Sequence, residues 1–338
     1  MPIVESRFRP AWWLPGPHLQ TLGPVLARPT PRLEFDWERI ELDDGDFIDL
    51  AWARPRAGRP DAPTLTILPG LGGNYLSKYA RGLALDALAR GWSAGILHFR
   101  GTSRETNRLA KTYHAGLTSD PRQVLEHVRR TRPSAPIGAV GLSLGGSVLL
   151  NLLAEDGAGS PITAAAAASV PLDLAACARR IQRGFSRVYD RHLARELTSR
   201  LMARRPLVEK RLGPVDPRRL TSVESFDELV TAPLHGFVDA ADYYQRCSSG
   251  PRLGALKTPT IIVQALDDPF LVPEMIPSEP EIADAVTVEV ATSGGHVGFV
   301  GGPFPGRADY WLERRLIDFL ALHLEPPSGK KKPPSPKT

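Results

Sequence analysis

A serine between two glycines is the first residue of this chain whose setting suggests chemistry. Ser143 is the middle residue of Gly-Leu-Ser-Leu-Gly at 141–145, after an apolar run at 137–141 and before a helical pattern at 144–154. A strand that turns sharply into a helix pushes the hydroxyl clear of the backbone, and glycines keep neighbouring side chains away from it. The helix start also offers free N–H groups to an oxyanion. The segment therefore predicts that Ser143 is a nucleophile.

A serine nucleophile needs a base and an acid, and two segments downstream of Ser143 offer them in the order serine, acid, histidine. His296 follows the last predicted strand and is the expected base, because His98 and His114 precede the serine. Asp267 and Asp268 both follow the strand before it. We favour Asp268, since an Asp-Pro pair followed by a turn directs the acid back toward the histidine. Asp267 stays open as the alternative, and would otherwise cap its own turn.

The oxyanion of an acyl-transfer intermediate requires two backbone N–H groups. Leu144, directly after the serine, is expected to supply one, and Leu71 in Pro-Gly-Leu-Gly-Gly at 69–73 the other. Those glycines do not match a dinucleotide-binding loop, because Tyr75 stands where the third glycine is required, and the chain has no Walker A sequence. The acids between 43 and 49 lack EF-hand spacing. We therefore expect neither a cofactor nor a metal.

The elements that must position these groups alternate between strands and helices, which predicts an α/β fold with a mostly parallel sheet covered on both faces. In such a sheet, functional groups gather at the carboxyl ends of the strands. A β-hairpin is expected at 38–53, and Asp120 followed by Pro121 is expected to cap a helix. The Ala-rich run at 162–170 favours helix by propensity, but its place after the helix at 144–154 predicts a strand. The other expected strands are 63–68, 93–99, 259–265 and 285–291, and the other expected helices are 78–90 and 307–324.

The chain divides into a core with additions. Residues 1–36 are expected to be an N-terminal extension packed on the core, and residues 37–324 one α/β domain. A helical insertion at about 171–250 should form a cap, and the Pro/Lys-rich tail at 325–338 should be disordered. Between Arg179 and Arg219 the insertion carries 13 Lys or Arg against four acids. A solvated helical face is the favoured interpretation, and peripheral contact with an anionic membrane stays open.

The composition fits a cytoplasmic globular protein. The chain has 338 residues, 42% hydrophobic and 23% charged, with a net charge of +5. No apolar window is long enough to span a bilayer, and no signal peptide is expected at the N-terminus. Cys177 and Cys247 lack metal-ligand spacing and do not suggest a disulfide framework. The basic stretch has no aromatic residues interleaved with it, so we expect no nucleic-acid partner.

The chain resembles the YheT-like branch of the α/β-hydrolase superfamily, which is related to the eukaryotic α/β-hydrolase-domain lipases and esterases. The resemblance covers roughly residues 8 to 324. It rests on HLQTL (18–22), PGLGG (69–73), YHAG (113–116) followed by Thr118 and Asp120, GLSLGG (141–146), TAP (231–233), GF (236–237), DYY (242–244), DDPF (267–270) and GGHVGF (294–299).

The resemblance implies the triad Ser143, Asp268 and His296, acting as an esterase or acylglycerol lipase on small-molecule or lipid-like esters. This sequence has His98 where the family usually has asparagine. Two other functions stay open. An acyltransferase would use the same triad, and a binding module would use the scaffold without catalysis.

Overall fold

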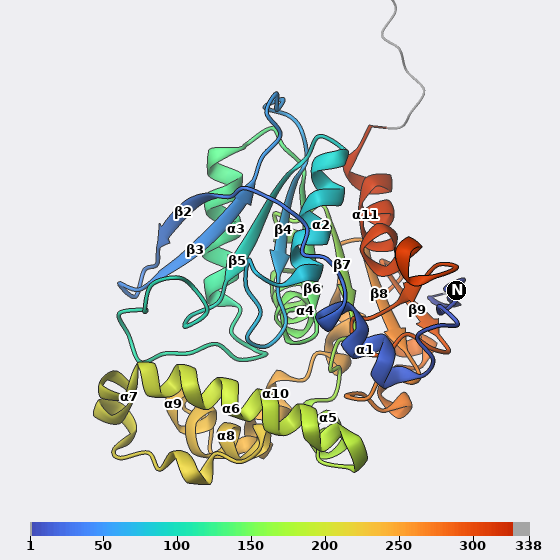
Figure 1. The fold of residues 1–338 in the computed structure, drawn as a ribbon. Helices are drawn as coiled ribbons and strands as arrows, with labels where there is room; N and C mark the ends of the chain where they lie inside the picture. Colours follow the sequence, from blue (N-terminus) through green and yellow to red (C-terminus); the bar gives the residue numbers. More distant parts are fainter. Residues whose placement is uncertain (1, 327–338) are drawn as a thin grey trace, which may run out of the picture.

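A nine-stranded sheet forms the centre of the computed structural model, which describes residues 2–326 (Figure 1). The strand order is β1-β9-β8-β7-β6-β4-β5-β3-β2. Every neighbouring pair is parallel except β2–β3 and β3–β5. The strands are β1 (Ile3–Glu5), β2 (Asp36–Glu41), β3 (Phe47–Ala53), β4 (Thr64–Leu68), β5 (Ser93–His98), β6 (Ile137–Leu142), β7 (Ala164–Ala168), β8 (Thr260–Ala265) and β9 (Val286–Ala291). The expected fold class and the expected hairpin are therefore confirmed.

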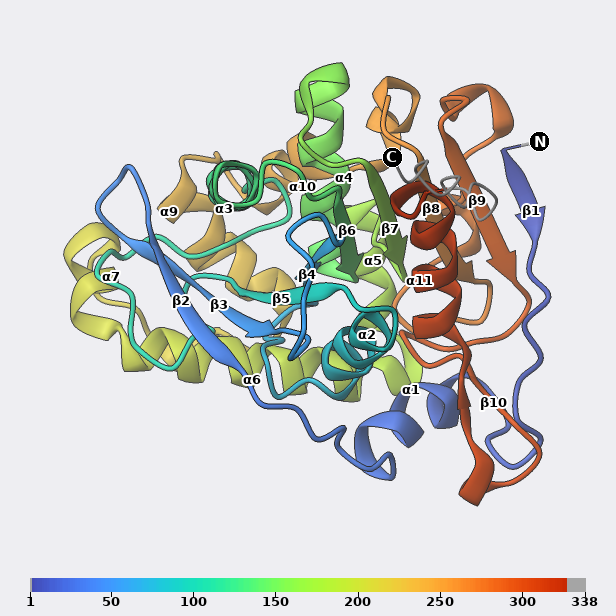
Figure 2. The same ribbon diagram turned by 90° about the horizontal axis from the view of Figure 1, so that it is seen from above.

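Helices cover both faces of the sheet, as Figure 2 shows from above. Helices α2 (Lys78–Ala89) and α11 (Trp311–Leu324) pack on one face, and α3 (Ser119–Thr131) and α4 (Leu144–Asp156) on the other. Strand β6 is wholly buried: its Ile137 and Ala139 belong to one core, and its Val140 and Leu142 to the other. Because successive strand residues point to opposite faces, a continuous apolar run serves both cores.

Strand β7 consists of five buried alanines, which confirms the strand predicted against helix propensity. It pairs in parallel with β6 on one side and with β8 on the other. Propensity differences are only about 0.7 kcal/mol per residue. Ladder hydrogen bonds on both edges, together with burial on both faces, therefore decide the conformation of this segment.

Two sequence predictions about the elements need correction. Helix α3 has Thr118 at its N-cap, without a side-chain cap, so Asp120 is not the cap. The Asp120 carboxylate instead binds the buried guanidinium of Arg100 at 2.6 and 2.8 Å, together with Asp46 from the β2–β3 hairpin. Helix α11 begins at Trp311, after a two-stranded ribbon of β10 (Val300–Gly301) and β11 (Asp309–Tyr310).

The N-terminal segment joins the core in two places. Strand β1 extends the sheet beside β9, which sequence reasoning did not anticipate. Helix α1 (Pro17–Leu26) packs beside the loop after β9. Of the tail predicted at 325–338, all but the first two residues lie outside the described part of the chain.

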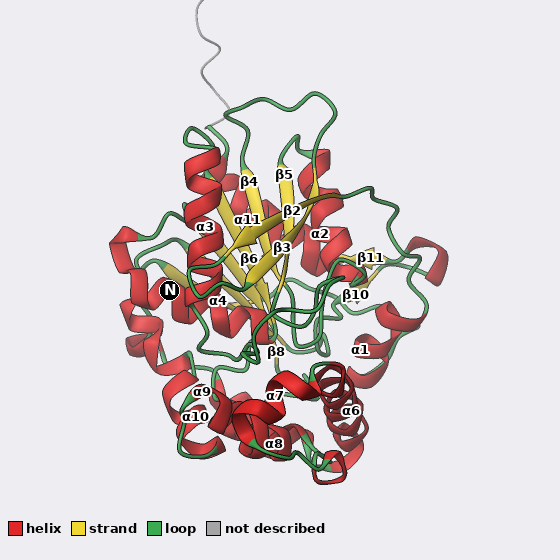
Figure 3. Ribbon diagram, turned by 90° about the vertical axis from the view of Figure 1, so that its left-hand side faces the viewer, coloured by secondary structure: helices red, strands yellow, loops and turns green. Residues whose placement is uncertain are grey.

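The segment between β7 and β8 is helical and lies across one end of the sheet (Figures 1 and 3). Its regular helices are α5 (Leu174–Ile181), α6 (Arg187–Ala203), α7 (Arg205–Leu212), α8 (Val223–Phe226), α9 (Ala232–His235) and α10 (Ala240–Cys247). A π-helical turn, Asp227–Thr231, joins α8 to α9. The thiols of Cys177 and Cys247 are free and buried. Among residues 2–326, no helix has both the length and the apolarity needed to cross a membrane.

Candidate active site

Ser143 occupies a strained turn between β6 and α4. Its φ of 52° and ψ of −124° lie outside the regions that side-chain-bearing residues normally adopt, and such a conformation costs on the order of 1–3 kcal/mol. The close approach of α4 to the sheet holds the turn in place. A Cβ atom at Gly145 would lie 2.2 Å from the Leu68 carbonyl oxygen, so only glycine fits there. The turn leaves the Ser143 side chain partly exposed at the carboxyl end of the sheet.

The structure brings Ser143, His296 and Asp268 together in one hydrogen-bonded chain. The Ser143 Oγ lies 3.0 Å from His296 Nε2, and His296 Nδ1 lies 2.8 Å from Asp268 Oδ2. The three residues follow β6, β9 and β8, at strand ends that share one edge of the sheet. The Asp268 side chain is fully buried and that of His296 is 10% exposed, so the contact between them is shielded from water.

The two adjacent aspartates have different partners. Asp267 accepts hydrogen bonds from the backbone N–H groups of Gly294 (2.8 Å) and Gly295 (3.0 Å), directly before the histidine. Burial raises the pKa of this carboxyl, and these N–H groups oppose the rise. Asp268 contacts His296 and also accepts from the Phe270 N–H at 2.8 Å. Asp267 therefore holds the loop that carries His296, a role that the sequence did not suggest.

Helix α1 supports the same loop from the other side. The Thr21 Oγ1 accepts the His296 N–H at 2.9 Å and donates to the Pro17 carbonyl at 2.7 Å. Gln20 pairs with both backbone groups of Val300, at 3.1 and 2.8 Å. Sequence reasoning missed these positioning residues. The sequence pointed to them only through the segment HLQTL at 18–22, which is one of the motifs shared with the family but had no predicted role.

The loop after β4 offers one free N–H group near the serine. The Gly70 N–H donates to Tyr79 Oη (3.0 Å) and the Gly72 N–H to Tyr113 Oη (2.6 Å). Burial raises the pKa of Tyr113 to about 12, so this hydroxyl stays protonated. Between these occupied donors, the Leu71 N–H has no acceptor within residues 2–326, and neither has the Leu144 N–H. Both groups predicted for the oxyanion are therefore available.

Two arginines at the C-terminal end of α6 donate hydrogen bonds to carbonyl groups in the loops after β4 and β5. Arg200 donates to the Gly72 carbonyl oxygen at 2.7 Å and to that of Gly101 at 3.2 Å. Arg204, one turn further, is buried and donates to the carbonyl oxygens of Leu109 and Lys111. These two cations of the basic stretch therefore face the core, whereas the sequence suggested a solvated face.

A cavity of about 600 Å³ opens beside the serine, between the sheet edge and the helical segment. Its walls are mainly apolar. Leu71 and Leu144 line it together with Ser143, and the residues that line it from α5 and α6 include Leu174, Ile181, Leu193 and Leu197. A cavity of this size and polarity accommodates a small apolar molecule or one acyl chain.

His98 and His114, the other two histidines considered from the sequence, accept hydrogen bonds from backbone N–H groups and do not act on Ser143. His98 Nε2 accepts the Tyr75 N–H at 3.2 Å, and burial lowers its pKa to about 4. His114 lines the cavity, but its Nδ1 accepts the Gly116 N–H at 3.2 Å, and burial lowers its pKa to about 3. Both rings are thus neutral, and neither contacts Ser143. Within the described residues, no group of three or more His, Cys, Asp or Glu side chains is arranged to hold a metal ion.

Comparisons with known proteins agree with this architecture. The family model of the α/β-hydrolase fold matches residues 63–303. The chain is 40% identical to YheT of Escherichia coli (strain K12) over 95% of both chains. It is 29% identical to the human phospholipase ABHD3, over 96% of this chain and 81% of the relative. A solved structure of the Pyrococcus furiosus esterase Pf2001 has a TM-score of 0.56 at 18% identity, covering 86% of this chain and 91% of that one, and so shares the fold.

The matched residues 63–303 contain both the strained serine turn and the loop that carries His296. The agreement with YheT extends further and includes helix α1, which supports the histidine loop in this structure. The chain therefore belongs to the α/β-hydrolase fold family, in its YheT-like branch.

Proposed function

We propose that this protein hydrolyses carboxylic esters, with Ser143 as nucleophile, His296 as general base and Asp268 as the carboxylate that orients the histidine. The observation that carries the proposal is the unbroken chain of contacts from Ser143 Oγ through both ring nitrogens of His296 to Asp268. A serine hydroxyl is a weak nucleophile until a neighbouring base takes its proton. A carboxylate at Nδ1 fixes the tautomer that leaves Nε2 free to do so.

The reaction then proceeds through an acyl-enzyme. Ser143 Oγ attacks the ester carbonyl carbon as its proton passes to His296 Nε2, and the oxyanion accepts hydrogen bonds from the N–H groups of Leu71 and Leu144. The C–O bond to the alcohol breaks, and His296 donates its proton to the departing oxygen. Water, deprotonated by His296, attacks the acyl-enzyme. The carboxylic acid leaves and the Ser143 hydroxyl is restored.

The cavity and the relatives favour an ester with an apolar acyl group. The cavity walls are mainly aliphatic, and relatives of the chain bear the names phospholipase and monoacylglycerol lipase. The helical segment 171–250 contributes one wall of the cavity, so it acts as a cap over the hydrolase core and decides which acyl groups enter. Arg200 links this cap to the loop that carries Leu71.

Covalent labelling tests the proposal directly. A fluorophosphonate should modify the wild-type protein and a Ser147→Ala control, but not a Ser143→Ala variant. Ser147 lies one turn into the same helix, and its hydroxyl contacts the Pro171 carbonyl. Loss of the nucleophile should lower kcat for a soluble ester on the order of a millionfold. Wild-type turnover by Ser143→Ala would refute the assignment.

The same assay separates the two other functions. An acyltransferase would convert the ester mainly to a new ester when an alcohol or thiol acceptor is added, whereas a hydrolase would still release the acid. A binding module would neither react with the fluorophosphonate nor turn over any ester. Esters of graded chain length would then define the acyl group that the cavity prefers.

A further inference from the structure

Exposed apolar side chains surround the entrance of the cavity. The exposed residues among those that line the cavity, Val25, Leu76 and His192, lie on α1, on the turn at 74–78 and on the N-terminal half of α6, so the cavity opens between these segments. We call the three segments the mouth face. Side chains of each segment line the cavity, among them Val25, Leu76 and Leu193. Val25 is 61% exposed and Leu76 is 59% exposed, so large apolar groups stand in water at the rim.

The apolar surface continues outward from the rim on both sides. Leu26 on α1 is 75% exposed, Phe185 in the turn just before α6 is 53% exposed, and Val188 in the first turn of α6 is 54% exposed. Patches of this kind on a soluble protein usually mark a binding surface. Figures 2 and 3 both show α1 close to α6 on this side of the molecule.

Specific contacts make the mouth face one continuous surface. The His18 ring on α1 lies 4.6 Å from the Phe185 ring, and its Nδ1 lies 3.1 Å from Tyr189 Oη on α6. On the other side of α1, Lys78 Nζ donates to the Val25 carbonyl oxygen at 2.7 Å. The three segments therefore hold fixed positions around the entrance.

A stripe of free positive charge flanks the entrance on α6. Arg187, Arg191 and Arg195 recur every four residues, so they share one side of the helix, and all three are exposed. In the described part of the chain, none of the three has an acidic partner within 4.0 Å, whereas Arg205 pairs with Glu209 in the next helix. At 100° per residue, Val188 lies between this stripe and the cavity-lining Tyr189. The stripe therefore adjoins Val188, at the outer edge of the apolar surface, and lies on the side of α6 turned away from the cavity-lining residues.

The combination fits an anionic lipid bilayer. Apolar side chains that enter the lipid boundary, next to arginines that contact acidic headgroups, are the features of interfacial binding. A second copy of this chain fits poorly, because the mouth face has little negative charge to meet the stripe. Residues 16–28 and 74–78 contain no acid, and on the N-terminal half of α6 Asp190 is buried and Glu196 pairs with Arg200. Two such faces would repel each other.

We propose that the mouth face docks onto anionic lipid bilayers, with α1 and the turn at 74–78 contacting the acyl region and the α6 stripe contacting acidic headgroups. The role of this docking rests on the proposed function, because docking would bring lipid-like esters to the cavity entrance for hydrolysis. The docking itself needs no catalysis, and so it is testable on its own.

Vesicle sedimentation of the full chain tests the docking. We expect the protein to sediment with vesicles that contain phosphatidylglycerol and to stay in solution with pure phosphatidylcholine vesicles. The triple change Arg187→Gln, Arg191→Gln and Arg195→Gln should weaken binding on the order of a hundredfold at low salt, about fivefold for each arginine. High salt should weaken wild-type binding in the same direction.

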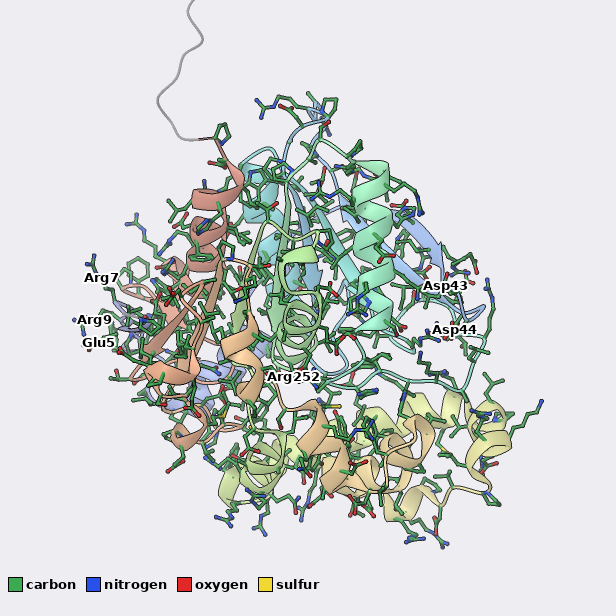
Figure 4. The ribbon with its side chains drawn as sticks, turned by 180° about the vertical axis from the view of Figure 1, so that it is seen from behind. Glu5, Arg7, Arg9, Asp43, Asp44 and Arg252 are labelled. Carbon is green, nitrogen blue, oxygen red and sulfur yellow. The ribbon has the colours of Figure 1, made fainter. Side chains whose placement is uncertain are left out.

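A matched control removes the same charge elsewhere. Arg7, Arg9 and Arg252, labelled in the view from behind in Figure 4, lie away from the mouth face, and their change to glutamine should leave vesicle binding within about twofold of wild type. The change Leu26→Ser with Val188→Ser should weaken binding through lost apolar contact. Hydrolysis of a soluble ester should be unaffected in every variant, which shows that each one is folded.

Three results would overturn the proposal. The first is absence of sedimentation with anionic vesicles at low salt. The second is equal loss of binding in the α6 triple variant and in the control, which would indicate attraction through net charge. The third is self-association of the chain that Leu26→Ser with Val188→Ser abolishes, since the partner of the mouth face would then be a second copy. If vesicle binding follows the expected pattern but no ester is turned over, the docking stands and the proposed function fails.

Discussion

The two hydrogen-bond partners of the Asp268 carboxylate determine what an amide would do in its place. Oδ1 accepts the Phe270 N–H at 2.8 Å, and Oδ2 faces His296 Nδ1 at 2.8 Å. In an Asp268→Asn variant, the Phe270 N–H requires the amide oxygen and so turns the amide NH₂ toward His296. The ring must then accept at Nδ1 and carry its proton on Nε2, where it cannot take a proton from Ser143.

We therefore expect Asp268→Asn to lower kcat by about 10⁴, as a triad acid replaced by its amide does elsewhere. Asp267→Asn should lower it less than tenfold, because the amide oxygen can still accept from both N–H groups of the histidine loop. Asp267→Ala removes the single oxygen that accepts from both N–H groups. At about 1 kcal/mol for each hydrogen bond, it should cost about 2 kcal/mol of unfolding free energy, with a further loss of activity from a loosened loop.

Steady-state hydrolysis of a soluble p-nitrophenyl ester measures kcat, and chemical denaturation measures the unfolding free energy of the same samples. Asp268→Asn should keep wild-type stability to within about 1 kcal/mol, because the fold of the turn is preserved. A loss of 10⁴ for Asp267→Asn, with a mild effect of Asp268→Asn, would refute the reasoning and move the acid to Asp267.

Three further changes test other parts of the structure. Arg200→Ala should lower kcat about tenfold with a smaller change in KM, because it frees the loop that carries the Leu71 N–H proposed for the oxyanion. Arg205→Ala on the exposed surface should change kcat by less than about twofold. Gly145→Ala should destabilise the fold by about 3 kcal/mol or more in thermal unfolding, through its clash with a backbone carbonyl, whereas Gly159→Ala, with no atom within 4 Å, should not. Burial raises the pKa of Asp227 from 3.8 to about 7, so the folded state binds the proton of this carboxyl more tightly than the unfolded chain does. The contribution of the protonated carboxyl to the unfolding free energy is therefore fully present below about pH 4 and is lost as the pH rises through about 7. The Asp227→Asn variant has no titrating group at this position, so its unfolding free energy relative to wild type should rise with pH, by up to about 4 kcal/mol at pH 8. A difference in unfolding free energy that does not change with pH would contradict this assignment.

The sequence alone was enough to predict the elements with strong local patterns. Strand β6 is apolar throughout and ends just before Ser143, which lies between Gly141 and Gly145, so the burial of the strand and the turn after it followed from residue type. The alternation of such strands with amphipathic helices left few arrangements besides a parallel sheet. Because parallel strands end at one edge, the meeting of Ser143 and His296 also followed from their places in the chain.

Other features depended on contacts between residues far apart in sequence. Asp120 carries the sequence signal of a helix cap, yet its carboxylate binds Arg100, which reaches it only in the folded sheet. A three-residue segment such as β1 has too little pattern to predict pairing with β9, nearly 300 residues away. Likewise, nothing local marks Thr21 as the acceptor of the His296 N–H.

The adjacent aspartates Asp267 and Asp268 show what the sequence could predict and what only the tertiary structure decided. Both follow β8 and both are acids, so the sequence placed a carboxylate near His296 but identified which one only by a turn preference. The tertiary structure separated them by their partners: the loop at 294–296 gives its N–H groups to Asp267 and its imidazole to Asp268. Residue type and order determined which chemistry could assemble. Packing between distant segments decided which atoms meet, because hydrogen bonds form over about 3 Å, a distance that only the folded chain sets.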